Sequence, residues 1–279
     1  MIVIQISPEN LSRYQRANDY MKVHFGKMRF YKVIVGAGNF YAFTAKVVNA
    51  TRLLHKENFD TFFRVTLNQV KFTGTKAFPL LSIIALTIGA STIIQAFNFL
   101  PKFGANDFMG NLLKLVIVRE VGPLITAIVI LTRSGSAIAT ELATQKLHGE
   151  IESIELMGIN PFSLLILPRV IAGLLATTLL IVYFDLIAFM GGFGISTLVS
   201  SYPFSSFLES ILQSASISDL FSTAVKSAVY GLTIPLVCSY YGYQPTTLFE
   251  IPIFVSRAVV RSLFAVFLLN ILISVIFYL

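Results

Sequence analysis

The stretch from Ala77 to Leu100 carries no charged side chain. A helix rises about 1.5 Å per residue, so this stretch is long enough to cross the roughly 30 Å hydrocarbon layer of a bilayer. The whole chain has a mean hydropathy of +0.77 and only 13% charged residues, about half the charge of a soluble domain. Its apolar runs are continuous rather than alternating, which argues against a β-barrel. The sequence therefore predicts an all-α integral membrane protein.

Further apolar runs follow the first and bring the predicted total to about five membrane spans. They lie at about residues 112–132, 170–199, 224–241 and 262–279. The run at 170–199 contains Asp185 as its only charge and is longer than one untilted crossing, so we expect it to leave the membrane near Gly191 and Gly192. Five spans would place the two ends of the chain on opposite sides of the membrane.

The basic residues predict the direction of insertion. Residues 1–76 hold twelve of the 21 Lys and Arg residues, whereas residues 190–217 contain none. In a five-span arrangement, the loop around residues 133–169 and the loop with Arg257 and Arg261 fall on the same side as the N-terminus. Since basic loops stay in the cytoplasm, we expect a cytoplasmic N-terminus. The formal net charge of +7 follows this membrane pattern, and we expect no nucleic-acid partner.

Residues 1–70 form a predicted N-terminal segment, ahead of a membrane domain at residues 71–279. In the N-terminal segment, basic side chains are mixed with aromatic ones. This composition favours helices that lie in the headgroup layer on the cytoplasmic face. An ordinary soluble helical extension is the alternative.

The stretch from Glu141 to Arg169 is the longest polar-rich interruption in the apolar part of the chain. Its first half has apolar residues at helical spacing and acidic residues on the other faces: Leu147, Ile151 and Ile154, and Glu150, Glu152 and Glu155. We expect this amphipathic helix to stop at Gly158, because Asn160-Pro161 follows. An acidic helix between two spans would suit binding to a soluble partner. A solvated helix that only connects two spans is the alternative.

Arg119 and Glu120 are adjacent charges inside an apolar segment. Such charges cost at least ~2.5 kcal/mol each at mid-helix and mark a protein interior or a water-filled cavity. Neighbours on a helix point about 100° apart, so the two cannot face one partner together. Gly122-Pro123 allows a bend or a freed carbonyl. The pair either lines a substrate cavity, forms a buried structural ion pair or lies at an interfacial position near the membrane surface. For Asp185, we favour a polar helix–helix contact over contact with substrate.

No motif for catalysis, metal binding or nucleotide binding is present. The three His residues have no metal-ligand spacing, and Cys238 is the single cysteine. Because the sequence lacks a Gly-Lys-Ser/Thr phosphate loop, any ATP must be bound by another subunit. We therefore expect a non-enzyme that carries no cofactor or metal of its own. The rival interpretation is a membrane-embedded enzyme that modifies lipids with Glu120 or Asp185 as acid or base, but the sequence offers no matching nucleophile.

Several segments resemble the MlaE-type permeases. They are VREVGPLITA (Val118–Ala127), TRSGSAIATELATQK (Thr132–Lys146), ELMGINP (Glu155–Pro161), LPRVIAGLL (Leu167–Leu175), the pattern Asp185 with Gly191 and Gly192, and SRAVVRS (Ser256–Ser262). The resemblance covers about residues 70–279. The block from Arg119 to Gly192 is specific in order and spacing.

This resemblance implies the permease subunit of an ABC-type transporter for phospholipids or other bulky lipids. Permeases of this family are homodimers that work with a cytoplasmic ATPase subunit and a lipid-binding MCE-domain subunit. The resemblance implies a bacterial inner membrane, with the plastid inner envelope as the alternative location. A membrane scaffold that anchors an MCE complex without moving lipid is the alternative function.

The family also implies roles for individual residues. Its loop helix docks on the ATPase, which assigns coupling to Glu141, Glu150, Glu155, Met157, Gly158 and Pro161. Its lipid cavity at the dimer interface is lined by a pair that corresponds to Arg119 and Glu120. The other matched motif residues are expected to be structural: Arg133, Gly135, Arg169, Asp185, Gly191, Gly192, Arg257 and Arg261. Two departures from the family pattern are Ile151 after Glu150, and Ile253, Phe254 and Val255 in place of glycines.

Overall fold

A computed structural model describes residues 29–52, 59–99, 109–200, 209, 212–213 and 216–278. The chain divides into two compact units, Met1–Asn49 and Ala50–Leu279. Within the first unit the structure describes residues 29–49, which belong to helix α2 (Arg29–Arg52). The expected interfacial helices before Arg29 lie outside the described residues, and the interfacial role of residues 1–70 stays a prediction.

The second unit is a bundle of long helices. In order along the chain they are α3 (Phe59–Phe99), α4 (Met109–Leu113), η4 (Lys114–Val121), α5 (Gly122–Ile130), η5 (Leu131–Gly135), α6 (Ser136–Leu147), α7 (Glu150–Leu156), η6 (Phe162–Ile166), α8 (Leu167–Ser200), α10 (Ile217–Gly242), η7 (Leu248–Glu250) and α11 (Ile251–Tyr278). The part of the chain that the structure describes contains no strand. The predicted all-α class is confirmed.

Five helical stretches are long and apolar enough to cross a membrane, which confirms the predicted spans. They cover residues 62–99, 111–147, 162–198, 217–242 and 248–278. Most extend beyond the apolar runs, because their helices continue through polar residues at the ends. Helix α3 already begins at Phe59, so the expected domain boundary at residue 70 falls inside it. Helix α8 runs unbroken through Gly191 and Gly192 to Ser200.

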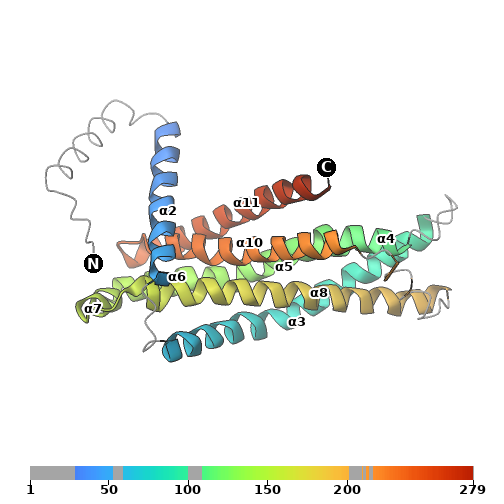
Figure 1. The fold of residues 1–279 in the computed structure, drawn as a ribbon, viewed down its shortest axis with the longest axis horizontal. Coiled ribbons are helices and arrows are strands. Elements are labelled where there is room, and N and C mark those ends of the chain that lie inside the picture. Colours follow the sequence, from blue (N-terminus) through green and yellow to red (C-terminus); the bar gives the residue numbers. More distant parts are fainter. Residues whose placement is uncertain are drawn as a thin grey trace. The chain divides into compact units, whose positions relative to one another are not determined.

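Small residues allow the long helices to pack closely. Helices α3 and α8 run side by side along the second unit (Figure 1). A methyl group added to Gly89 of α3 would lie 1.9 Å from the carbonyl oxygen of Ala188 on α8, and one added to Gly191 would lie 2.7 Å from that of Leu86. Backbones approach this closely only where side chains are absent or small. Gly191 and Gly192 therefore belong to the α3–α8 contact, since Gly192 meets Ile93 of α3.

Helix α7 lies at one end of the second unit, at the left in Figure 1, with α4 at the other end. The amphipathic helix expected across Leu147 and Ile151 is divided, and that prediction was wrong in this respect. Gly149 adopts a φ of 74°, which ends α6 and redirects the chain into α7. Only glycine takes this left-handed conformation at little cost.

The expected stop at Gly158 is confirmed. Gly158 has a φ of 77°, its amide donates to the Glu155 carbonyl at 2.9 Å, and the Ile159 amide donates to the Ile154 carbonyl at 3.2 Å. These two bonds form a Schellman motif that satisfies the last carbonyls of α7. Asn160 precedes the next helix, and its side chain accepts the Phe162 amide at 2.9 Å.

Candidate functional site

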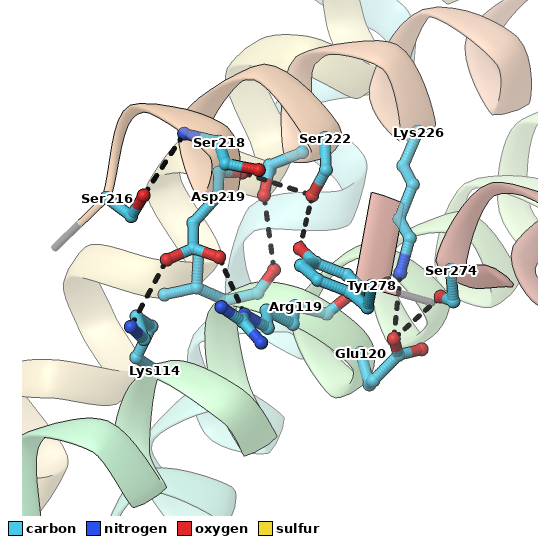
Figure 2. Close-up of polar contacts among 12 residues, drawn as sticks. Lys114, Arg119, Glu120, Ser216, Ser218, Asp219, Ser222, Lys226, Ser274 and Tyr278 are labelled. Carbon is cyan, nitrogen blue, oxygen red and sulfur yellow. Dashed lines mark hydrogen bonds and ion pairs between the residues drawn. The ribbon is translucent and has the colours of Figure 1, made fainter. Parts of the chain in front are cut away.

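Arg119 and Glu120 lie in η4, an eight-residue π-helical segment. Segments of this kind are rare and are frequent at functional sites. Pro123 lies in the first turn of α5, two residues after η4 ends at Val121. Helix α10 packs against η4, and its side chains supply most of the polar partners. As expected for adjacent residues, Arg119 and Glu120 face different partners (Figure 2).

Glu120 accepts hydrogen bonds from three helical neighbours. Lys226 Nζ of α10 lies 3.1 Å from Oε1, Ser274 Oγ of α11 donates to Oε1 at 2.7 Å, and Asn270 Nδ2 donates to Oε2 at 2.9 Å. Tyr230 completes the group by donating to Asn270 Oδ1 at 2.7 Å. The Lys226 side chain is fully buried, whereas 36% of the Glu120 side chain is exposed. The carboxylate is thus held on one side and open on the other.

Arg119 belongs to a second group around Asp219. Its Nε donates to Asp219 Oδ1 at 2.6 Å, and Lys114 Nζ lies 3.3 Å from Oδ2 of the same carboxylate. The guanidinium stacks on the Tyr278 ring, 4.1 Å from its centroid, and the Tyr278 hydroxyl contacts Ser222 Oγ at 2.5 Å. Asp219 is buried, while 24% of the Arg119 side chain is exposed. A planar guanidinium fixed at Nε keeps its terminal nitrogens in a defined orientation.

Asp185 does not belong to either group. Its Oδ1 atom is buried and has no hydrogen-bond partner within the described part of the chain. A methyl group added to Gly122 would lie 2.6 Å from this atom, so Asp185 is packed against the junction of η4 and α5. Asp185 therefore lies where two helices meet, but its Oδ1 atom has no polar partner there, and its role as a polar helix–helix contact stays a prediction.

Three residues of the site were not predicted from the sequence: Lys226, Asp219 and Asn270. Lys226 lies inside an expected span, and a lysine at membrane depth is itself a signal of a buried partner or a cavity. Asp219 lies outside the expected span, because helix α10 begins seven residues before Ala224 of that span. Asn270 carries no charge and gives no comparable signal.

The residues assigned to coupling divide into exposed and structural ones. Glu150 and Glu155 are exposed on α7, and Gly158 is exposed just after the helix ends. Leu156 and Met157 are 88% and 67% exposed. Pro161 is buried at the start of the next helix. Glu141 instead forms an ion pair with Arg169, at 2.8 Å. The exposed part is an acidic surface with an apolar tip.

The end of α6, just before α7, is held by contacts with the loop after α10. Lys146 Nζ, at the end of α6, donates to the carbonyls of Tyr243 and Pro245 at 2.8 and 3.1 Å. Burial, with the nearby carboxylates of Glu155 and Glu152, raises the pKa of the Tyr243 phenol above its usual value. The loop after α10 is therefore part of the support for α7.

Of the remaining motif residues, Arg133, Gly135 and Arg261 contact other helices, whereas Arg257 contacts a residue of its own helix, α11. Arg133 Nη2 donates to the Lys76 carbonyl of α3 at 3.0 Å. A methyl group on Gly135 would lie 2.9 Å from Cys238 Sγ of α10. Arg261 Nη1 donates to the Tyr241 hydroxyl at 2.6 Å, and Arg257 lies over the Phe254 ring, 5.0 Å from its centroid.

No group of three or more His, Cys, Asp or Glu residues that could hold a metal ion occurs in the ranges that the structure describes. The charged groups of the site pair with one another instead. The site has the composition of a polar lining within an apolar bundle.

Comparison with known protein families decides the family. The family model described as "Permease MlaE" matches residues 66–276. The chain belongs to the MlaE permease family. The matched range contains α7 and every residue of the site around η4 except Tyr278, so both α7 and the site belong to this family's membrane domain.

Relatives of this MlaE-family chain occur in bacteria and in a plant. A probable ABC transporter permease protein of Rickettsia typhi is 26% identical over 182 residues, which are 65% of this chain and 70% of that protein. The chloroplast protein TRIGALACTOSYLDIACYLGLYCEROL 1 of Arabidopsis thaliana is 31% identical over 221 residues, 77% of this chain and 62% of that protein. The intermembrane phospholipid transport system permease protein MlaE of Haemophilus influenzae is 26% identical over 193 residues, 69% of this chain and 74% of that protein.

Proposed function

We propose that this chain is the permease subunit of an ABC-type phospholipid transport system. It acts as a homodimer, together with a separate ATPase subunit and an MCE-domain subunit that binds lipid. It works without catalytic residues or a cofactor of its own, because its partner binds and hydrolyses ATP. Membership of the MlaE family and the name of the Haemophilus relative support the substrate class.

The observation that carries this proposal is the separation of two features along the bundle. Helix α7 presents its apolar tip, Leu156 and Met157, at one end. The partly exposed pair of Arg119 and Glu120 lies toward the opposite end, because α10 runs from Asp219 beside η4 to Gly242 beside Ala139 of α6. One end suits a soluble partner, and the other suits a polar headgroup within the membrane.

The ATPase docks on α7 in this proposal. Its contact is the acidic surface with the exposed apolar tip, which suits a partner with basic residues around an apolar pocket. Because α7 follows α6 after one turn, and the end of α6 is hydrogen-bonded to the loop after α10, a displacement of α7 is passed to the long helices. The long helices then alter the surroundings of Arg119 and Glu120.

The chain works in the inner membrane of a bacterial cell, with its N-terminus and α7 in the cytoplasm. The distribution of basic residues supports this direction. The Arabidopsis relative, whose name places it in the chloroplast, supports the plastid inner envelope as the alternative.

Charge reversal on α7 tests the docking. We expect Glu150→Lys combined with Glu155→Lys to reduce co-purification of the ATPase strongly, while the membrane bundle keeps its unfolding temperature. Glu209→Lys is the matched control, because Glu209 is also exposed and acidic but lies outside α7. Undiminished co-purification in the α7 variant would contradict the assignment.

A further inference from the structure

We infer that Thr223 and Lys226 of α10 are positioning residues that hold η4 in its π-helical form and thereby fix Arg119 and Glu120 at the cavity. This inference rests on the proposed function, in which Arg119 and Glu120 line the lipid cavity. Hydrogen bonds between α10 and η4 are the observations that carry it. It concerns two backbone carbonyls of η4 that have lost their usual amide donors.

The first carbonyl belongs to Arg119. In an α-helix it would accept the amide hydrogen four residues later, but that residue is Pro123, which has none. Lys226 Nζ donates to this carbonyl in place of the missing amide. The same ammonium group contacts Glu120 Oε1 at 3.1 Å, so one buried side chain satisfies both the backbone and the carboxylate.

The second carbonyl belongs to Val118. Its usual donor would be the Gly122 amide, but Gly122 donates to Ile117, five residues back. Thr223 Oγ1 donates to the Val118 carbonyl at 3.3 Å. Other threonines in the bundle, such as Thr132 and Thr140, donate to a carbonyl of their own helix four residues back. Thr223 instead donates across to another helix, where a carbonyl needs a donor.

Both donors lie on one face of α10. Thr223 and Lys226 are three residues apart, and Asp219 is four residues before Thr223, so all three share the face that meets η4. Unsatisfied carbonyls are strongly unfavourable at membrane depth. The π-helical form, and with it the placement of Arg119 and Glu120, therefore depends on α10 staying packed against η4. Any movement of α10 would change the presentation of both charged residues.

Hydrogen–deuterium exchange on the full chain in lipid nanodiscs tests this inference. We expect Lys226→Met to speed exchange in peptides covering residues 114–124 by about tenfold, the effect of losing one hydrogen bond to a charged group. Adding Pro123→Ala supplies an amide hydrogen, which in an α-helical turn reaches the Arg119 carbonyl four residues back. The double variant should therefore return most of the way to the wild-type rate, whereas Pro123→Ala alone should change little.

Two more variants separate this role from general packing. Thr178→Val is the matched control, because Thr178 contacts Ser227 of α10, next to Lys226, but its hydrogen bonds go to Ser227 and to Leu174 of its own helix rather than to η4. Exchange in residues 114–124 should stay unchanged. Thr223→Val keeps the shape and every charge, and it should speed exchange severalfold and lower the amount of co-purified phospholipid. Failure of Pro123→Ala to restore Lys226→Met, or wild-type exchange in Thr223→Val, would overturn the inference. Absence of lipid from the wild-type chain would instead contradict the proposed function.

Discussion

Arg169, at the start of α8, donates from Nη2 to Oε1 of Glu141 on α6 at a distance of 2.8 Å. The Arg169 side chain is almost completely buried, while half of the Glu141 side chain is exposed. Arg169 also donates to the Leu165 carbonyl at 3.1 Å. This ion pair joins α6, which precedes α7, to α8, which follows it. We call the joined ends of α6 and α8 the support of α7.

Breaking this support should loosen α7. Arg169→Met removes the ion pair and should lower the free energy of unfolding by about 1–2 kcal/mol, a value kept small because Glu141 is solvated. We expect less ATPase to co-purify with this variant. Arg133→Met is the control, since Arg133 also donates to a backbone carbonyl but lies away from α7. Equal ATPase recovery from both variants would argue against a role of the support.

The left-handed stop of α7 predicts a specific glycine requirement. Gly158→Ala should destabilise the end of α7 by about 1–2 kcal/mol, because a side chain disfavours the φ of 77° found there. No neighbouring atom blocks the added methyl group, so the effect would come from the backbone alone. The measurement is the rate of proteolysis within residues 150–162 of the folded chain.

Gly194→Ala is the control for this prediction. Gly194 lies inside α8 and also has open space around it, but its backbone is helical. Alanine there should be neutral or stabilise the helix by about 0.5–1 kcal/mol. Equal proteolysis of the two variants would show that the turn at Gly158 differs from the one described.

The α3–α8 contact predicts a steric requirement at Gly89. Gly89→Ala would place a methyl group 1.9 Å from the Ala188 carbonyl oxygen, so the two backbones must separate, at a cost of roughly 1–3 kcal/mol. Gly74→Ala in the same helix meets only Phe78, at 3.7 Å, and should be tolerated. Unfolding in mixed micelles measures both variants. A Gly89→Ala protein as stable as wild type would contradict the packing.

The ion pair of Arg119 with Asp219 predicts coupled stability. Asp219→Asn leaves Arg119 without its charged partner and should cost about 1–3 kcal/mol, below the value for a fully buried pair because Arg119 is partly exposed. Arg119→Gln combined with Asp219→Asn should cost less than the sum of the single variants. Additive losses would mean that the two side chains do not interact. Glu209→Gln, at an exposed position, provides the baseline for loss of a surface carboxylate.

The sequence was a good guide to the features that depend on local pattern. Uncharged length predicts spans, and the five apolar helices confirm them. The end of α7 at Gly158 was predictable, because glycine commonly ends helices and Asn160-Pro161 disfavours continuation of the helix. Gly122-Pro123 indicated a freed carbonyl, and the Arg119 carbonyl is one.

The sequence was a poor guide to features that depend on which helices meet. The partner of Glu120 lies more than a hundred residues away on α10, and no spacing rule connects the two positions. The division at Gly149 was missed because apolar periodicity continues across it, from Leu147 to Ile151. The π-helical form of η4 depends on donors from α10, so it is not visible in the segment itself.

Mass spectrometry of the gently solubilised chain, purified from its own membrane, tests the central claim most directly. Proteins and lipids that co-purify would be identified together from the same sample. A lipid permease predicts an ABC ATPase subunit, an MCE-domain protein and bound phospholipid. Recovery of the chain with neither partner nor lipid would contradict the proposed function.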